Sequence, residues 1–381
     1  MTEPVRHADI VILGAGPVGM ALAQALRGSR HTVLLLDPKP RGAWASDPRA
    51  LAIAHGSRQL LERLDAWPAG DATAIRDIHV SQQGGFGRTL LEAGDYDIPA
   101  LGYVMRYRNL AARLDLGLDA ESLLSPATLE SLTPGEDAVQ LRVSHRGETL
   151  RIAARLVVHA EGTPGDSPAY WKHDYRQQAV IAEVQPAKPH GHRAWERFTA
   201  DGPLALLPLE QVFSVVLTAP SAVAQKLLHA DDETFLAALR QRFSGRLDFV
   251  ASGPRAAFPL ALRLRKNCVD ARQVWIGNTA QTLHPVTGQG FNLGLRDAWS
   301  LAEALWENPS PDPGTPGALA AYQRKRQPDR LVGTLLTDGL VRLFSNAFTP
   351  LQHLRGAGLL AFDLIPPLRH PIARQMIWGR R

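Results

Sequence analysis

Asp9-Ile10-Val11-Ile12-Leu13 runs directly into Gly14-Ala15-Gly16-Pro17-Val18-Gly19 near the start of the chain. The first five residues favour a buried strand, and the Ala/Leu-rich residues 20–26 favour a helix. A second apolar run at residues 32–36 is typical of a parallel strand. The segment therefore predicts a strand–helix–strand unit with a glycine-rich turn.

Each glycine of this turn has its own role. Gly14 permits the tight turn, Gly16 lets the backbone approach a pyrophosphate, and Gly19 allows close helix–strand packing. The helix N-terminus that follows can bind the pyrophosphate. Asp37 ends the second strand, 23 residues after Gly14, where an acid can hold a ribose hydroxyl. We predict a dinucleotide site here; the alternative is a glycine-rich turn without a ligand.

Composition sets the class of protein. The chain has 381 residues, of which 45% are hydrophobic and 21% charged, which excludes a disordered or fibrous protein. Cys268 is the single cysteine, so cysteine-based metal clusters are excluded. The polar start and the lack of a long apolar run predict neither a signal peptide nor a spanning helix, so we expect a cytoplasmic protein.

The remaining chain alternates between strand and helix patterns. Strands are expected at residues 75–82, 139–145, 176–185 and 204–218. Helices are expected at 106–116 and 231–243, and the chain beyond residue 290 is mostly helical. Residues 308–317 contain four prolines and predict a surface loop. The pattern predicts a mixed α/β fold.

A second glycine motif lies between residues 277 and 297. It follows the expected strand 274–276, and Pro285, Gly288 and Gly290 exclude an ordinary helix over 283–292. Gly288-Gln289-Gly290 can align successive N–H groups into an anion-binding nest at the start of the next helix. The negatively charged edge of a flavin ring is a natural occupant of such a nest.

The second motif resembles the flavin fingerprint of the single-component aromatic hydroxylases that use FAD and NAD(P)H. Asn278, Gln281 and Thr282 resemble the ubiquinone-biosynthesis branch of that family, and within it the 2-octaprenyl-6-methoxyphenol hydroxylases. Further similar segments are residues 46–53, 78–87, 100–104, 174–177, 195–198, 202–208 and 258–260. The resemblance covers nearly the whole chain.

The resemblance implies a Rossmann-like FAD-binding domain interleaved with a β-sheet substrate domain and followed by C-terminal helices. The FAD-binding parts would be residues 1–72, 101–168 and 266–305. The substrate domain would be residues 73–100 and 169–265, and the helical region residues 306–381. The only dinucleotide fingerprint would serve FAD, with NAD(P)H binding transiently as co-substrate.

The resemblance also implies which residues bind FAD. The first motif would hold the pyrophosphate, Asp37 the adenosine ribose, and Asn278 the ribityl–pyrophosphate region. Pro285 would flank the flavin ring, and the backbone at 288–290 would face its pyrimidine edge. The full predicted set is Gly14, Ala15, Gly16, Pro17, Gly19, Asp37, Arg49, Arg106, Glu161, Asn278, Pro285, Gly288, Gln289, Gly290 and Asn292.

Glu161 departs from the family pattern. It occupies the first position of the family's Asp-Gly motif, whose aspartate serves both FAD and NAD(P)H binding. Glutamate keeps the charge but changes its reach. This substitution leaves open a flavin-binding pseudoenzyme that serves as a subunit of a biosynthetic assembly.

The implied reaction needs no metal and no protein nucleophile. NAD(P)H reduces the flavin, which then activates O₂ for transfer of one oxygen atom to an electron-rich ring. The substrate would be a polyprenylated phenol, with a soluble aromatic compound as the alternative. His79, Tyr103 and His284 could assist phenol deprotonation, but residues of these types more often have a packed or hydrogen-bonded structural role, so we assign no catalytic residue.

The C-terminal region is basic and apolar. Residues 320–381 contain ten Lys/Arg and three Asp, a charge of +7 against +5 for the whole chain. An apolar helical stripe includes Leu336, Leu340, Leu343, Phe344, Ala347, Phe348 and Leu351. Such helices can lie on the inner face of an anionic membrane or simply cover the FAD-binding domain. Other ubiquinone-biosynthesis proteins are further candidate partners; nucleic acid is not.

Overall fold

The computed structural model describes residues 5–344 and 349–379. Their central strand is β1 (Val5–Leu13), which pairs in parallel with β2 (Val33–Leu36) on one side and β11 (Glu148–His159) on the other. The eight-stranded sheet continues through β8 (Leu123–Leu124), β9 (Ala127–Thr133), β10 (Val139–His145), β18 (Val269–Asp270) and β19 (Gln273–Trp275). The predicted strand–helix–strand unit at the N-terminus is therefore correct.

The glycine turn is closely packed against β11. Gly14 has φ +100°, and a β-carbon there would lie 2.5 Å from the Ala160 carbonyl oxygen. α1 (Pro17–Ala25) follows the turn, and α3 (Tyr107–Leu116) packs beside it. The core between these helices and the sheet contains Ile10, Ile12, Leu22, Leu110, Leu156 and Val158.

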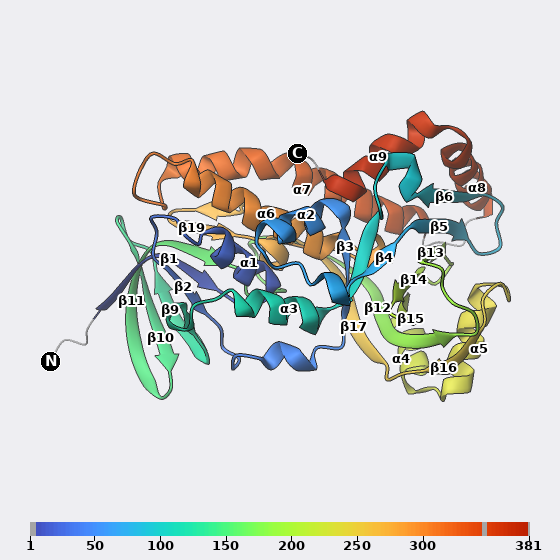
Figure 1. Ribbon diagram of the computed structural model, residues 1–381, viewed down its shortest axis with the longest axis horizontal. Coiled ribbons are helices and arrows are strands. Elements are labelled where there is room, and N and C mark those ends of the chain that lie inside the picture. Colours follow the sequence, from blue (N-terminus) through green and yellow to red (C-terminus); the bar gives the residue numbers. More distant parts are fainter. Residues whose placement is uncertain (1–4, 345–348, 380–381) are drawn as a thin grey trace.

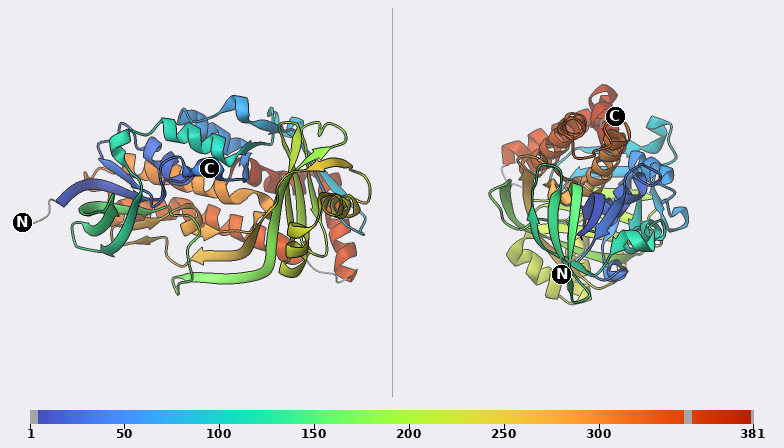
Figure 2. Two further views of the ribbon diagram at one scale, coloured as in Figure 1. Left: turned by 90° about the horizontal axis from the view of Figure 1, so that it is seen from below. Right: turned by 90° about the vertical axis from the view of Figure 1, so that its left-hand side faces the viewer.

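A nine-stranded sheet forms the other end of the molecule (Figures 1 and 2). Its strands are β5 (Asp77–Gln82), β6 (Arg88–Glu92), β12 (Tyr170–Pro186), β13 (Arg193–Phe198), β14 (Pro203–Leu209), β15 (Val212–Pro220), β16 (Phe249–Ser252), β17 (Ala256–Arg265) and β20 (Gln281–Thr282). α4 (Ser221–His229) and α5 (Asp232–Arg242) cover one face. The single strand expected at 204–218 is wrong: it is the hairpin β14–β15, because Glu210 adopts φ +55° and turns the chain.

A small third sheet lies between these two. It contains β3 (Ala50–Ala54), β7 (Gly102–Arg106) and β4 (Thr73–Ile75), and α2 (His55–Arg63) follows β3. Short 3₁₀ turns are η1 (Ala43–Ser46), η2 (Ala69–Asp71), η3 (Ala93–Tyr96), η4 (Ala120–Ser122), η5 (Gly277–Thr279) and η6 (Pro285–Thr287). The chain thus passes repeatedly between the two large sheets, although the exact segment boundaries stay a prediction.

Helices dominate the C-terminal part, as predicted. They are α6 (Gln289–Trp306), α7 (Pro316–Phe344), α8 (Thr349–Leu364) and α9 (Pro366–Trp378). α8 and α9 lie beside β5 and β6 at one end of the molecule (Figure 1). Ala347, Phe348 and the side chain of Leu351, part of the predicted stripe, lie outside the described residues.

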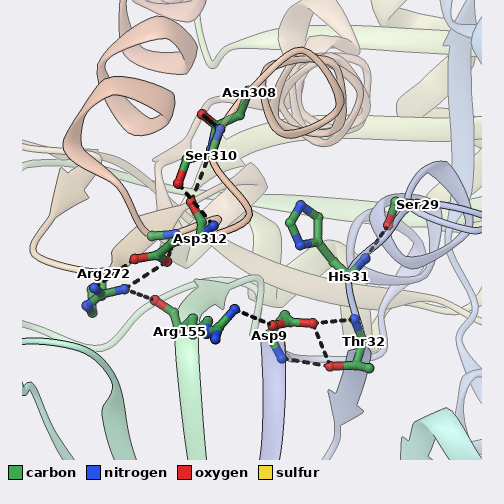
Figure 3. A network of polar contacts seen from close by, with 10 residues as sticks. Asp9, Ser29, His31, Thr32, Arg155, Arg272, Asn308, Ser310 and Asp312 are labelled. Atoms are coloured by element: carbon green, nitrogen blue, oxygen red, sulfur yellow. Dashed lines mark hydrogen bonds and ion pairs between the residues drawn. The ribbon is translucent and has the colours of Figure 1, made fainter.

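The loop before α7 is fixed to the first sheet by polar contacts (Figure 3). Arg272 donates to both carboxylate oxygens of Asp312 at 3.0 and 2.9 Å and to the Arg155 carbonyl at 3.0 Å. Arg155 donates in turn to Asp9 on β1 at 3.3 Å. These bonds hold the predicted proline-rich loop in one position.

A buried charge network links α6, α7 and the second glycine motif. Asp297 accepts hydrogen bonds from Gly277 N–H (3.0 Å), Gln281 Nε2 (2.6 Å) and Arg326 Nε (2.7 Å). Arg326 and Arg296 both donate to Asp329, at 2.6 and 2.8 Å. Asp297 and Asp329 are each 1% exposed. We call these four charged residues the Asp297 network.

The Asp297 network also makes the stability of the fold depend on pH. Burial alone would raise the pKa of Asp329, but the charges of Arg296 and Arg326 lower it to about 2. A carboxyl with a depressed pKa stabilises the fold above its unfolded pKa of roughly 3.9, and that stabilisation is lost as the pH falls below it. The contribution of Asp329 therefore disappears between about pH 4 and pH 2.

Asp297→Asn should destabilise the protein by about 3 kcal/mol, because removing one partner of a buried ion pair leaves the other charge uncompensated. Denaturant unfolding of the purified variant measures this loss. Asp312→Asn is the matched control, since Asp312 pairs with Arg272 nearer the surface and should lose no more than about 1 kcal/mol. Equal losses for the two variants would contradict a special role for the Asp297 network.

Candidate functional site

The turn at Gly16 leaves the N-terminus of α1 open. Gly16 is the N-cap residue, and no side chain caps the helix. A β-carbon at Gly16 would have only the Tyr107 hydroxyl within 4 Å, at 3.7 Å. The N–H groups of the first turn after Pro17 thus face space into which a phosphate can fit. On its other side the turn is closely packed, because a β-carbon at Gly19 would lie 2.0 Å from the Gly14 carbonyl oxygen.

Asp37 is held directly beside this turn. Its Oδ2 accepts the Ala15 N–H at 2.7 Å, and its Oδ1 accepts the Lys39 N–H at 2.8 Å. Each carboxylate oxygen keeps a further lone pair for a hydroxyl group. The backbone of Ala15 therefore positions the acid rather than a phosphate, and Asp37 can accept from a ribose.

Glu161 lies on the loop that packs over Gly14. The Glu161 α-carbon would be 2.9 Å from a β-carbon at Gly14. Its carboxylate is 3.1 Å from His159 Nδ1, and the His159 ring stacks on Trp275 with centroids 4.4 Å apart. The Glu161 side chain is 44% exposed, so the carboxylate remains accessible at the edge of the cofactor turn.

The two predicted arginines differ in their surroundings. Arg49 pairs with Asp47 at 2.6 Å and lies 4.7 Å above the Tyr107 ring, which connects it to the space over Gly16. Arg106 instead donates to Glu183 and, at 3.1 Å, to Glu210. Both carboxylates belong to the nine-stranded sheet region, so Arg106 joins β7 to that sheet and its guanidinium is already engaged.

The first and second motifs pack against each other. The Val18 side chain would be 2.8 Å from a β-carbon at Gly294 and 3.3 Å from one at Gly277. Asn278 follows Gly277, and its Nδ2 is 3.5 Å from Thr163 Oγ1, on the loop that carries Glu161. Asn278 therefore lies beside the loop that carries Glu161, and its contact with the ribityl–pyrophosphate region stays a prediction.

The other end of the site is the turn before α6. Pro285 begins η6, and Gly288 adopts φ +60° as the N-cap of α6, without a side-chain cap. A β-carbon at Gly290 would have no atom within 4 Å. Its backbone is thus open to a ligand, as is expected of an anion-binding nest.

Asn292 supports this turn from behind. Its Oδ1 accepts the Ala54 N–H at 2.8 Å, and its Nδ2 donates to the carbonyls of Ala52 (2.9 Å) and Gly288 (2.7 Å). It is 1% exposed. Asn292 therefore positions β3 and the nest, while Gln289 donates to the Met376 carbonyl at 3.1 Å and joins the nest to α9.

An apolar cavity of about 90 Å³ adjoins this nest. Thr287, Gly288, Gln289 and Asn292 form one wall. The other walls are apolar residues of β3, β5, β6 and α9, among them Ile53, Ile78, Leu91, Met376 and Ile377. A cavity of this composition suits an apolar ring placed between the nest and the nine-stranded sheet.

The three candidate bases are each engaged in ring packing or hydrogen bonds within the protein. His79 contacts Trp195 on the far face of β5, with centroids 4.6 Å apart, and burial lowers its pKa. The Tyr103 hydroxyl accepts from Arg58 at 3.0 Å, and its ring packs on Trp67. His284 is 1% exposed, its Nδ1 accepts the Val286 N–H, and burial lowers its pKa to about 4.

The sequence analysis missed three residues that lie at the candidate site. Tyr107 lies between Arg49 and Gly16, and only its place after Arg106 hints at this. Met376 and Ile377 line the cavity although they lie some 85 residues beyond the nest, and no local pattern predicts such a return. No group of His, Cys, Asp or Glu within the described chain could hold a metal ion.

Comparison with known proteins identifies the fold family. Residues 7–331 match the model of the FAD binding domain family. The chain belongs to this FAD-binding family. The features that fit FAD are the uncapped start of α1, the space over Gly16 and the open backbone at Gly290.

Two curated relatives of this flavoprotein carry the names of ubiquinone-ring hydroxylases. It is 36% identical to ubiquinone hydroxylase UbiL of Rhodospirillum rubrum, over 97% of this chain and 89% of the relative. It is 30% identical to 3-demethoxyubiquinol 3-hydroxylase of Escherichia coli, over 94% and 95%. The flavoprotein is therefore a monooxygenase with FAD as its cofactor, and the predicted ubiquinone-biosynthesis branch is confirmed.

A solved structure supports the same fold. That of p-nitrophenol 4-monooxygenase PnpA from Pseudomonas putida DLL-E4 superimposes with a TM-score of 0.78 over the full length of both chains, at 16% identity. At this identity the match shows the fold alone. The predicted α/β fold class is confirmed.

Gly16→Ala should weaken FAD binding at least about tenfold, roughly 1.4 kcal/mol, because its β-carbon would enter the space over the turn. The fold should persist, since the nearest atom is 3.7 Å from that β-carbon. FAD titration of the apoprotein, followed by flavin fluorescence, measures the change. Gly70→Ala, whose β-carbon would have no atom within 4 Å, is the control; equal affinity in the two variants would contradict the assignment.

Proposed function

We propose that this flavoprotein hydroxylates the aromatic ring of a polyprenylated phenol in ubiquinone biosynthesis, using NAD(P)H and O₂. The observation that carries the proposal is the apolar cavity beside the Gly288–Gly290 nest, in a chain that matches ubiquinone hydroxylases over nearly its whole length. Bound FAD supplies the redox chemistry, accepting a hydride from NAD(P)H and activating O₂.

The residues of the chain bind, orient and exclude water. The α1 N-terminus and Gly16 would hold the pyrophosphate, and Asp37 the adenosine ribose. Asn292 would hold the nest against the ring edge through its bonds to Gly288 and β3. The apolar walls of the cavity would keep water from the reacting ring.

Glu161 lies where it can affect the reduction of FAD by NAD(P)H. Its accessible carboxylate lies beside the turn at Gly14, where the family's aspartate serves both nucleotides. Glutamate is longer by one methylene, yet the loop places its α-carbon close to Gly14. We propose that Glu161 performs the aspartate's role, and that the chain is an active enzyme rather than a flavin-binding subunit of an assembly.

Anaerobic mixing of the FAD-loaded protein with NADH or NADPH should bleach the flavin, faster when a polyprenylphenol is present. Glu161→Ala should slow bleaching about tenfold or more, and Glu161→Asp should stay near wild type, since the carboxylate is retained. Stopped-flow absorbance measures each rate. If neither nucleotide bleaches the wild-type flavin with the phenol present, the protein is not an active enzyme. The hypothesis of a flavin-binding subunit of an assembly then replaces the proposed function.

The C-terminal helices offer a surface for peripheral membrane contact. α8, the residue after it and the start of α9 carry exposed apolar side chains; we call Leu354, Leu360, Leu364, Ile365, Leu368 and Ile372 the apolar patch. No helix among the described residues is long and apolar enough to cross a bilayer. We propose that the apolar patch rests on the membrane, where a polyprenyl substrate resides.

The basic charge of this region is less available than its sequence suggests. Arg326 is buried in the Asp297 network, Arg342 pairs with Asp338 at 2.7 Å, and Arg369 pairs with Asp95 at 2.9 Å. Attraction to anionic lipid is therefore secondary here, and burial of the apolar patch is the main contribution to the proposed contact.

α9 connects the apolar patch to the cavity. Its Ala373, Met376 and Ile377 line the cavity, while Leu368 and Ile372 belong to the exposed patch. One helix thus separates the proposed membrane surface from the proposed ring site. A prenyl tail that remains in the bilayer could pass along this helix while the ring enters the cavity.

The double variant Leu364→Glu/Leu368→Glu should lose co-sedimentation with liposomes of phosphatidylglycerol and phosphatidylethanolamine. Its NADH oxidation with a short-chain, water-soluble phenol should stay at the wild-type rate. Leu331→Glu/Leu335→Glu, which alters exposed leucines of α7 outside the patch, is the matched control. If wild type does not sediment with liposomes, the patch contacts another protein or the substrate is soluble.

A further inference from the structure

One row of side chains crosses the nine-stranded sheet without being fully packed. Strand pairing places Val80 (β5), Glu196 (β13), Ala205 (β14), Val216 (β15) and Ile181 (β12) side by side on one face. All five are only half-buried. We call them the sheet row.

The opposite face of the same strands is tightly packed. Val180, Leu204, Leu206, Val215 and Leu217 there are at most 1% exposed and pack under α4 and α5. The half-buried sheet row therefore belongs to the face that looks toward the FAD-binding domain. η6, the short turn that precedes the Gly288–Gly290 nest, contacts β14.

The sheet row adjoins the apolar cavity. Ala194 precedes Glu196 by two residues on the same face of β13, and its partner Ile78 lines the cavity. Two residues along a strand span roughly 6.6 Å, so a ring that extends from Ile78 along this face of the sheet would meet the Glu196 side chain. The Glu196 carboxyl is thus within reach of a ring that lies between the nest and the sheet.

Glu196 is the charged member of an otherwise apolar row, and its Oε1 is buried. Within residues 5–344 and 349–379, Oε1 accepts no hydrogen bond. The adjacent Arg197 is no partner, because it points to the other face and donates to the Arg242 carbonyl, Ser81 and Ser244. A buried carboxyl oxygen without a partner is costly for the fold, by about 1–3 kcal/mol.

Charged groups on the elements packed over this face are engaged elsewhere. On α7, Asp338 is held by Tyr175 and Arg342. On α8, Asp363 accepts the Leu90 N–H and Arg355 lies over the Phe344 ring. Burial, with no compensating charge, raises the pKa of Glu196 to about 8. The carboxyl is therefore largely protonated at neutral pH and can both donate and accept a hydrogen bond.

We propose that Glu196 is the positioning group for the substrate: its carboxyl hydrogen-bonds the hydroxyl of a phenol whose ring lies on the sheet row. This inference rests on the proposed function and adds the polar contact that the apolar cavity walls lack. The hydrogen bond would fix which ring carbon faces the nest, and it needs no proton transfer.

The test uses the full-length, FAD-loaded protein and a short-chain 2-prenylphenol with its O-methyl ether as probes. Glu196→Leu should weaken binding of the phenol roughly 10- to 100-fold, because one hydrogen bond is lost. Binding of the ether, which lacks the hydroxyl, should change little. Glu196→Gln keeps a donor and an acceptor and should bind the phenol nearly as wild type does. Perturbation of the flavin absorbance measures each Kd without turnover.

Stability distinguishes this role from a structural one. Removing an unpartnered carboxyl should leave the melting temperature of Glu196→Leu equal to or above that of wild type. The folded protein retains a proton that the unfolded chain releases above about pH 4.3, so wild-type stability falls as the pH rises toward 8. The Leu variant lacks this fall, and its advantage should grow from pH 5 to pH 8.

Two outcomes would overturn the proposal. One is equal affinity of wild type and Glu196→Leu for the phenol; the other is a marked loss of melting temperature in Glu196→Leu at pH 7. Glu233→Leu on the exposed surface of α5 is the control for removal of a charge. If wild type binds the phenol but never hydroxylates it, the proposed function fails while the Kd comparison still decides the role of Glu196.

Discussion

The position of the Gly288–Gly290 nest depends on one buried carboxylate. Asp297 receives Gly277 N–H, Gln281 and Arg326, so a single side chain joins the start of the second motif, its middle and α7. Gly277 in turn packs on Val18 at the start of α1. The two halves of the cofactor site are therefore held in register from within the core, where water cannot compete for these bonds.

This arrangement divides the molecule into packed and unpacked faces. Around Asp297 and on the α4–α5 face of the second sheet, side chains are almost wholly buried. The sheet row and the cavity walls beside the nest are apolar but incompletely packed. A binding site for a flavin and an apolar ring requires such an incompletely packed face. The fold is less stable there, and tighter packing in the core compensates for that loss.

The sequence predicted what local chemistry determines. Gly14, Gly16 and Asp37 lie within one strand–turn–helix–strand unit, and Pro285 with Gly288 forces a turn whatever surrounds it. Arg106 was expected to contact FAD, yet two carboxylates from the other sheet engage it, and no local pattern reports them. The partnership of Asp297 with Arg326 and the return of Met376 to the cavity also depend on tertiary packing, which periodicity cannot reveal. The hairpin at Glu210 was missed because its turn carries neither glycine nor proline.

Glu196 shows why a charged residue inside a sheet is informative. Glu196 is followed directly by Arg197, a residue of opposite charge that does not pair with it. Strand alternation instead sends Arg197 to the α5 face and leaves Glu196 among Val80, Ala205 and Val216. A leucine would pack there without an unpartnered oxygen, so the fold gains nothing from the carboxyl. A group that destabilises the free protein is explained if it gains its partner only when a substrate binds.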